Sequence, residues 1–150
     1  MRMRAAAVVA LAALAVSGCG GGGGKTQRLS RDEYVAKADA ICAQAVKQQK
    51  ALPTPSSIDE IPAYVDKALP VIDDAIAKIR KLKPPVTMEQ GVKAWLDQTE
   101  ATRSELTKLR SAAKSGDPTK VRKVAAKGTQ MDSERSALAR SIGLTTCANT

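Results

Sequence analysis

The chain has 150 residues and a formal net charge of +9, with one Trp, two Tyr, three Cys and no His. Without His there is no Ser-His-Asp or Cys-His nucleophile pair and no imidazole metal ligand, and three Cys cannot complete a four-thiolate zinc site. The length fits one domain, since single domains commonly have about 100–200 residues. We therefore expect one domain that is not an enzyme, with no catalytic or metal-binding residues and no cofactor.

Residues 1–18 have the layout of an export signal. Arg2 and Arg4 precede residues 5–16, which are only Ala, Val and Leu. This run is too short to span a membrane, because a spanning helix needs roughly 20 apolar residues. A basic start, a short apolar stretch and small residues after it are typical of a cleaved signal peptide.

The segment Val16-Ser17-Gly18-Cys19 resembles the lipobox of bacterial prolipoproteins, an aliphatic residue and two small residues before Cys. The resemblance implies cleavage between Gly18 and Cys19 and a diacylglyceryl group, with palmitate-type acyl chains, on the Cys19 thiol. Two acyl chains give stable membrane anchoring. We expect a lipid-anchored protein on the extracytoplasmic face of the cell membrane. The alternative is an ordinary cleaved signal followed by an unrelated Cys.

Residues 19–28 are predicted to be a tether between the lipid anchor and a folded domain over residues 29–150. Five consecutive glycines occupy residues 20–24 and cannot bury surface, so the segment is typical of a flexible linker.

The first predicted helix covers residues 29–52. Ser30 and Glu33 fit a capping box, and Leu29 and Tyr34 occupy the hydrophobic staple positions around it. Apolar residues then recur at helical spacing, until Pro53 ends the pattern.

The second predicted helix covers residues 57–83, where apolar residues recur every three or four positions. Pro62 fits the first helical turn, which would make residues 58–61 a lead-in. Pro70 lies in mid-pattern and removes a backbone hydrogen bond, so we expect a kink. Pro84 and Pro85 end the helix.

The third helix is predicted over residues 87–114, with Thr87 and Gln90 as a second capping box and Trp95 as a core residue rather than a ligand-stacking one. Gly116, Asp117 and Pro118 then fit a left-handed helix end, an N-cap and a first turn.

The fourth predicted helix covers residues 118–142 and repeats its inward positions at heptad spacing, including Gly128 and Arg135; Gly143 ends it. Four helices with short connections predict an all-α, antiparallel up-down-up-down four-helix bundle with a kinked second helix. We expect the fourth helix to pack beside the first, which suggests an ion pair between Asp39 and Arg135. Arg135 reaching to solvent is the alternative.

Basic residues concentrate near the start of the fourth helix, and this basic patch consists of Lys120, Arg122, Lys123 and Lys127. An envelope protein, an anionic lipid or a cell-wall polymer would supply the opposite charge. Nucleic acid is not expected, since the protein is exported and has few aromatic residues for base stacking. The alternative is a solvated helix face.

Once Cys19 is assigned to lipid, Cys42 and Cys147 remain. Two thiols outside the cytosol most often form one disulfide, and two free buried thiols are the alternative. Residues 34–42 (YVAKADAIC) and 142–147 (IGLTTC), together with the Pro-Pro pair and Trp95, resemble a group of small helical lipoproteins from high-GC Gram-positive bacteria. The resemblance implies an envelope location, an all-helical domain and the Cys42–Cys147 pairing, but no biochemical activity.

Two functions follow as hypotheses. The favoured one is a non-enzymatic binding or interaction module at the cell envelope. Its rival is a carrier or sensor of a small apolar or lipid-like ligand, with a cavity between helices opened by Pro70 and Gly128. Asp73 and Asp74 are adjacent carboxylates, but helix neighbours point about 100° apart and cannot share a proton as a catalytic pair.

Overall fold

A computed structural model describes residues 27–149 of the chain, and over this range it is helical and contains no strand. The signal peptide, Cys19 and the glycine run lie outside the described residues. The α-helices are α1 (Arg31–Lys50), α2 (Ile61–Lys81), α3 (Glu89–Lys114) and α4 (Pro118–Ser141). Three short 3-10 helices accompany them: η1 (Ile58–Glu60), η2 (Val86–Met88) and η3 (Cys147–Asn149).

Local sequence signals account for most helix ends. The Ser30 side chain accepts a hydrogen bond from the backbone N–H of Glu33, and the Glu33 carboxylate accepts one from the backbone N–H of Ser30. Asp117 accepts the backbone N–H groups of Thr119 and Lys120. Gly116 has a φ of +67°, the left-handed conformation that glycine adopts without a side-chain clash.

Of two expected helix starts, one agrees with the position of Pro62 and the other does not. The lead-in before α2 is the 3-10 helix η1, as Pro62 suggested, so α2 begins at Ile61. The capping box of Thr87 and Gln90 is wrong. The 3-10 helix η2 precedes α3, which has Met88 at its N-cap and no side-chain capping bond.

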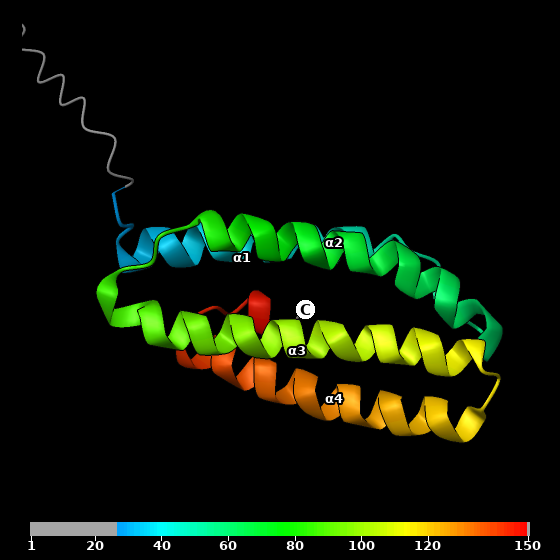
Figure 1. The fold of residues 1–150 in the computed structure, drawn as a ribbon. Coiled ribbons are helices and arrows are strands. Elements are labelled where there is room, and N and C mark those ends of the chain that lie inside the picture. Colours follow the sequence, from blue (N-terminus) through cyan, green and yellow to red (C-terminus); the bar gives the residue numbers. More distant parts are fainter. Residues whose placement is uncertain (1–26, 150) are drawn as a thin grey trace, which may run out of the picture.

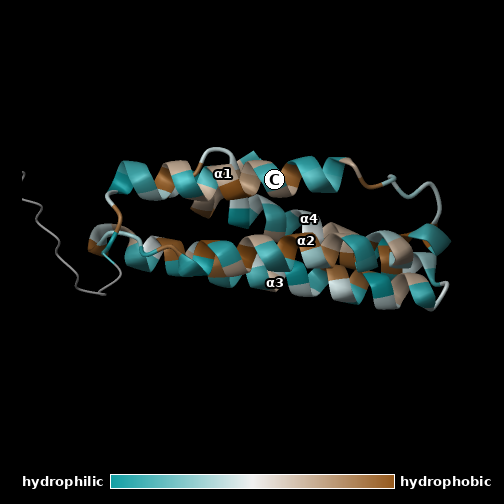
Figure 2. Ribbon diagram, turned by 90° about the horizontal axis from the view of Figure 1, so that it is seen from above, coloured by the Kyte–Doolittle hydropathy of each residue, from teal (hydrophilic) through white to brown (hydrophobic). Residues whose placement is uncertain are grey.

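The helices form two layers, α1 with α2 and α3 with α4 (Figure 1). Helix α4 packs mainly on α3, and α2 contacts both α1 and α3. Hydrophilic and hydrophobic residues alternate along each helix, as expected for helices buried on one side only (Figure 2). The start of α3 lies against the end of α4, where a Cβ added to Gly91 would come within 2.5 Å of Ile142 Cγ2.

The expectation that α4 packs along α1 is wrong, because the end of the chain comes between them. After Gly143, with a φ of +88°, the chain turns back, and η3 contacts both α1 and α4 (Figure 1). The Sγ atoms of Cys42 and Cys147 lie 2.06 Å apart, a disulfide between α1 and η3. The disulfide predicted from the sequence is therefore present in the fold.

Candidate functional site

Most of the buried apolar residues form two separate clusters, to which Val65, Ala68, Leu69 and Ile76 of α2 do not belong. The larger contains Tyr34, Trp95 and Cys147, and the smaller contains Ala112, Ala113 and Val121. Between Trp95 and Ala112 the only buried residue of α3 is Glu105. Helix α4 likewise has no buried residue between Val121 and Arg135. The middle parts of α3 and α4 therefore contribute no buried large apolar side chain.

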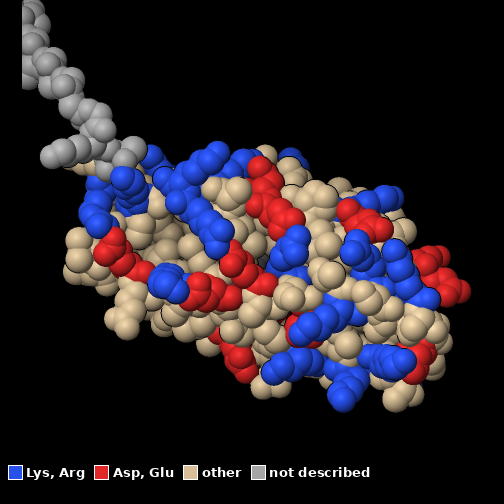
Figure 3. Space-filling view, in the orientation of Figure 1, with Lys and Arg blue, Asp and Glu red and all other residues tan. Residues whose placement is uncertain are grey.

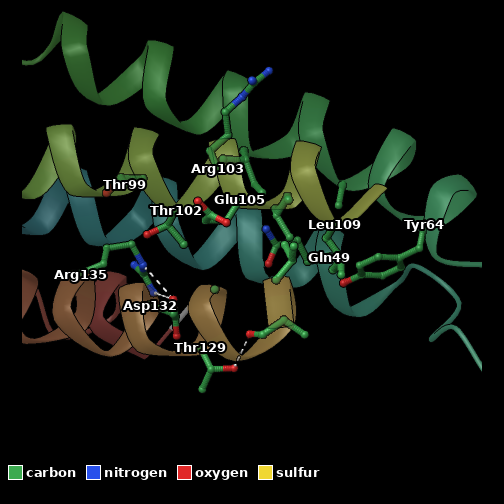
Figure 4. A pocket seen from close by; sticks show the side chains of 16 residues that line it. Gln49, Tyr64, Thr99, Thr102, Arg103, Glu105, Leu109, Thr129, Asp132 and Arg135 are labelled. Carbon is green, nitrogen blue, oxygen red and sulfur yellow. Dashed lines mark hydrogen bonds and ion pairs between the residues drawn. The ribbon is translucent and has the colours of Figure 1, made fainter. Parts of the chain in front are cut away.

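A cavity of about 490 Å³ occupies this middle region and is lined by residues of all four helices (Figure 4). Its volume falls in the range of about 300–1,000 Å³ that is usual for small-molecule sites. Small residues from two helices are part of its lining: Ala68 from α2, and Ala125 and Gly128 from α4. A Cβ added to Gly128 would meet no atom within 4 Å.

Most of the cavity lining is apolar. Ile72 comes from α2, Leu106 and Leu109 from α3, and Val124 from α4. Gln49 and Tyr64 bring polar atoms from α1 and α2 (Figure 4). A largely apolar pocket with a few converging polar groups is the usual composition of a ligand site.

Three ion pairs connect α2 with α3, one of them between Arg80 and Glu100. Arg103 donates from Nε and Nη2 to the two carboxylate oxygens of Asp73 at 2.7 and 2.8 Å, and Arg110 donates to Asp66 at 2.5 Å. The paired guanidinium holds the pKa of Asp73 below its ordinary value of 3.8, chiefly through these hydrogen bonds. Asp73 therefore connects α2 with α3.

Two acidic side chains lie on the cavity wall. Glu105 of α3 is 8% exposed, and its Oε1 lies 2.5 Å from Nζ of Lys108. Asp132 of α4 accepts hydrogen bonds on Oδ1 from Nε and Nη2 of Arg135 at 3.0 and 2.8 Å. The carboxylate of Glu105 and the Asp132–Arg135 pair face the same space from different helices (Figure 4).

A smaller space of about 60 Å³ extends the cavity toward the larger apolar cluster. The two spaces share Gln49, Ile72, Thr99 and Arg135 as lining residues. Trp95 lines the small extension, is 2% exposed, and its indole Nε1 has no hydrogen-bond partner among the described residues. Trp95 is thus a core residue, as predicted, and also the inner end of the cavity region.

The predicted ion pair between Asp39 and Arg135 is wrong, because both side chains instead bind the backbone of Cys147. The Asp39 carboxylate accepts the backbone N–H groups of Thr146 at 3.0 Å and Cys147 at 3.1 Å. Arg135 Nη1 donates to the carbonyl oxygen of Cys147 at 2.7 Å. The C-terminal segment is thus inserted between the two charges.

The basic patch is exposed at the start of α4, and basic side chains crowd that region of the surface (Figure 3). Lys120, Lys123 and Lys127 are three and four residues apart, so they share one side of the helix. Arg122 points to another side. Of the four, Lys120 has a nearby carboxylate, with Nζ at 3.6 Å from Asp117 Oδ2.

Sequence reasoning anticipated the cavity in part. Gly128 lines it as expected, whereas Pro70 is exposed on α2 and does not. Glu105 was missed. Its signal was spacing, since Thr102, Glu105, Leu109 and Ala112 follow one another at intervals of three or four residues and place Glu105 on an inward stripe of α3.

No family model, no curated protein and no solved structure matches this chain. None of the helices between residues 27 and 149 has both the length and the apolar character needed to cross a membrane. In the same range, no three His, Cys, Asp or Glu side chains group in a way that would hold a metal ion.

Proposed function

We propose that this chain is a lipid-anchored lipoprotein of the extracytoplasmic membrane face whose non-enzymatic helical domain binds a small apolar or lipid-like molecule. The observation that carries the binding role is the cavity of about 490 Å³, with its mainly apolar lining contributed by all four helices. A site of this size and composition suits a small ligand. The anchor rests on Cys19 in its lipobox-like context, with resemblance to helical lipoproteins as further support.

We also propose that the four helices form an antiparallel up-down-up-down bundle in which α2 is kinked at Pro70. Short connections support it, as does the close approach of Gly91 to Ile142. The backbone N–H of Leu29 also donates to the carbonyl of Lys83 at 2.9 Å, which joins the start of α1 to the end of α2.

Cavity binding is tested with decan-1-ol, an uncharged apolar probe, by calorimetry and by the fluorescence of Trp95, the only tryptophan. We expect saturable binding to the wild-type domain. Gly128→Leu should abolish it, because Gly128 lines the cavity and has room for a side chain. Replacing a helix-interior glycine also favours folding by up to about 1 kcal/mol, so loss of binding would not reflect unfolding.

Ala126→Leu is the matched control, since it adds the same side chain at an exposed position of α4. It should bind the probe like the wild type. Absence of binding to the wild-type domain, or equal binding by Gly128→Leu, would contradict the proposal.

The exposed lysines of α4 favour a second candidate function, contact with an anionic envelope surface. Replacing Lys120, Lys123 and Lys127 together with Gln should weaken binding to vesicles that contain anionic lipid. The control replaces exposed Lys37, Lys47 and Lys67 with Gln and removes the same charge. Equal loss in both triple variants would indicate general charge attraction and reject a specific patch.

A further inference from the structure

The net charge of +9 suggests that this protein prefers anionic ligands, but the two arginines on the cavity wall already bind protein acceptors. Arg103 uses Nε and Nη2 on Asp73, and its guanidinium points away from the cavity (Figure 4). Arg135 donates to Asp132 and to the carbonyl of Cys147. Both arginines on the wall are therefore committed to protein acceptors.

The threonine hydroxyls of the wall also offer acceptors rather than donors. Thr99 donates to the carbonyl of Trp95 at 2.7 Å, and Thr102 to that of Gln98 at 2.9 Å. Thr129 donates to the carbonyl of Ala125 at 3.1 Å. Since a hydroxyl has one donor and two lone pairs, each threonine can still accept from a ligand but has already used its proton.

The carboxylates retain acceptor capacity. Lys108 binds Oε1 of Glu105, and the two bonds from Arg135 go to Oδ1 of Asp132. Within the described part of the chain, Glu105 Oε2 and Asp132 Oδ2 accept no hydrogen bond. Glu105 is more than nine-tenths buried although its Lys108 partner is largely exposed. A buried carboxylate is costly unless its oxygens are paired.

We infer that the cavity selects a small apolar molecule carrying a cationic amine, with the amine bound by Glu105 and its apolar body against the leucine and isoleucine side chains. This inference rests on the proposed binding role of the cavity and names the chemical class of its ligand. An ammonium group supplies donors without acceptors, which matches the buried carboxylate of Glu105 and the accepting threonine hydroxyls; the donors that the wall also carries, on Gln49 and Tyr64, lie beside them. Charge-assisted hydrogen bonds are about twice as strong as neutral ones.

The test compares three ligands with the same ten-carbon chain at neutral pH: decylamine, decanoic acid and decan-1-ol, each below its micelle concentration. We expect decylamine to bind the wild-type domain about tenfold or more tightly than decanoate. The overall positive charge of the protein predicts the reverse order, so the ranking distinguishes cavity chemistry from long-range attraction.

The variant Glu105→Gln should remove the preference for decylamine and leave decan-1-ol binding unchanged. Glu134→Gln is the matched control, because it makes the same isosteric change at an exposed carboxylate of α4, and it should keep the wild-type ranking. If decan-1-ol binds but decanoate binds as well as decylamine, or if Glu105→Gln keeps the preference, this inference is wrong and the binding role stands. If none of the three binds, the proposed function fails as well.

Discussion

The backbone of Cys147 is held by Asp39, whose carboxylate accepts its N–H at 3.1 Å, while the Cys147 side chain bonds to Cys42 one turn further along α1. Asp39 and Cys42 are three residues apart, so they lie on the same side of the helix. Arg135 binds the carbonyl of Cys147 from α4. One residue near the end of the chain thus joins two helices that do not pack along each other.

Asp39→Ala should destabilise the domain. Asp39 Oδ1 accepts the backbone N–H groups of Thr146 and Cys147, and Oδ2 accepts the hydroxyl of Thr145, whereas an alanine side chain has no acceptor. Leaving a partly buried N–H unpaired costs about 1–3 kcal/mol. Urea unfolding should show a loss of this order, with faster amide exchange in residues 145–147. Asp32→Ala, at an exposed position of α1, should change stability little; an equal loss there would contradict a specific role for Asp39.

Reduction of the Cys42–Cys147 disulfide should lower stability strongly. The bond closes a loop across 105 residues of sequence separation, and the chain-entropy account assigns about 4–5 kcal/mol to a loop of this size. Urea unfolding with and without reductant measures the effect, and a Cys42→Ala, Cys147→Ala double variant should behave like the reduced protein. A mass unchanged by reductant would show that the native protein has no disulfide and that its two thiols are free.

Apart from the Cys42–Cys147 disulfide, the side-chain contacts that the sequence predicted correctly join neighbouring residues. The capping box at Ser30 and the turn at Gly116, Asp117 and Pro118 are local, since each bond joins groups within four residues. The Asp39–Arg135 pair failed because helix patterns do not show that the C-terminal segment comes between α1 and α4. The Thr87 capping box failed because a 3-10 turn occupies that position.

The cavity could likewise be predicted only in part from the sequence. The heptad pattern marked Gly128 as an inward position of α4, and it marked Arg135 correctly as buried. It gave no way to know that Ala68, Ala125 and Gly128 line one cavity, because the register of helices against each other depends on the whole packing arrangement. Glu105 stayed unnoticed for a related reason, since a charged residue on an apolar stripe usually reaches solvent.

Tyr34 should make the domain less stable in alkaline solution. Its side chain is fully buried, its hydroxyl has no hydrogen-bond partner among the described residues, and burial raises its pKa from 10.0 to about 12. Between these values the unfolded chain loses the phenol proton while the folded chain keeps it, so the free energy of unfolding falls as pH rises. The full loss is about 3 kcal/mol.

Tyr34→Phe should remove this part of the alkaline loss. At neutral pH it should equal or exceed the wild type in stability, because an unpaired buried hydroxyl is eliminated. Urea unfolding across pH 9 to about 12 tests both statements, with Tyr64→Phe as the control at the other tyrosine. A Tyr34→Phe profile parallel to that of the wild type would contradict the assignment.

Cys19→Ser should release the protein from the membrane or mislocalise it. The prediction depends on the lipobox-like segment Val16-Ser17-Gly18-Cys19, in which only a thiol can receive the diacylglyceryl group. Without acyl chains nothing in the helices of residues 27–149 is long and apolar enough to hold the protein in a bilayer. Fractionation of the host cells should therefore move the variant out of the membrane fraction. Ser17→Ala keeps a small residue and should stay anchored, whereas a Cys19→Ser variant that remains in the membrane fraction would show that another part of the chain attaches it.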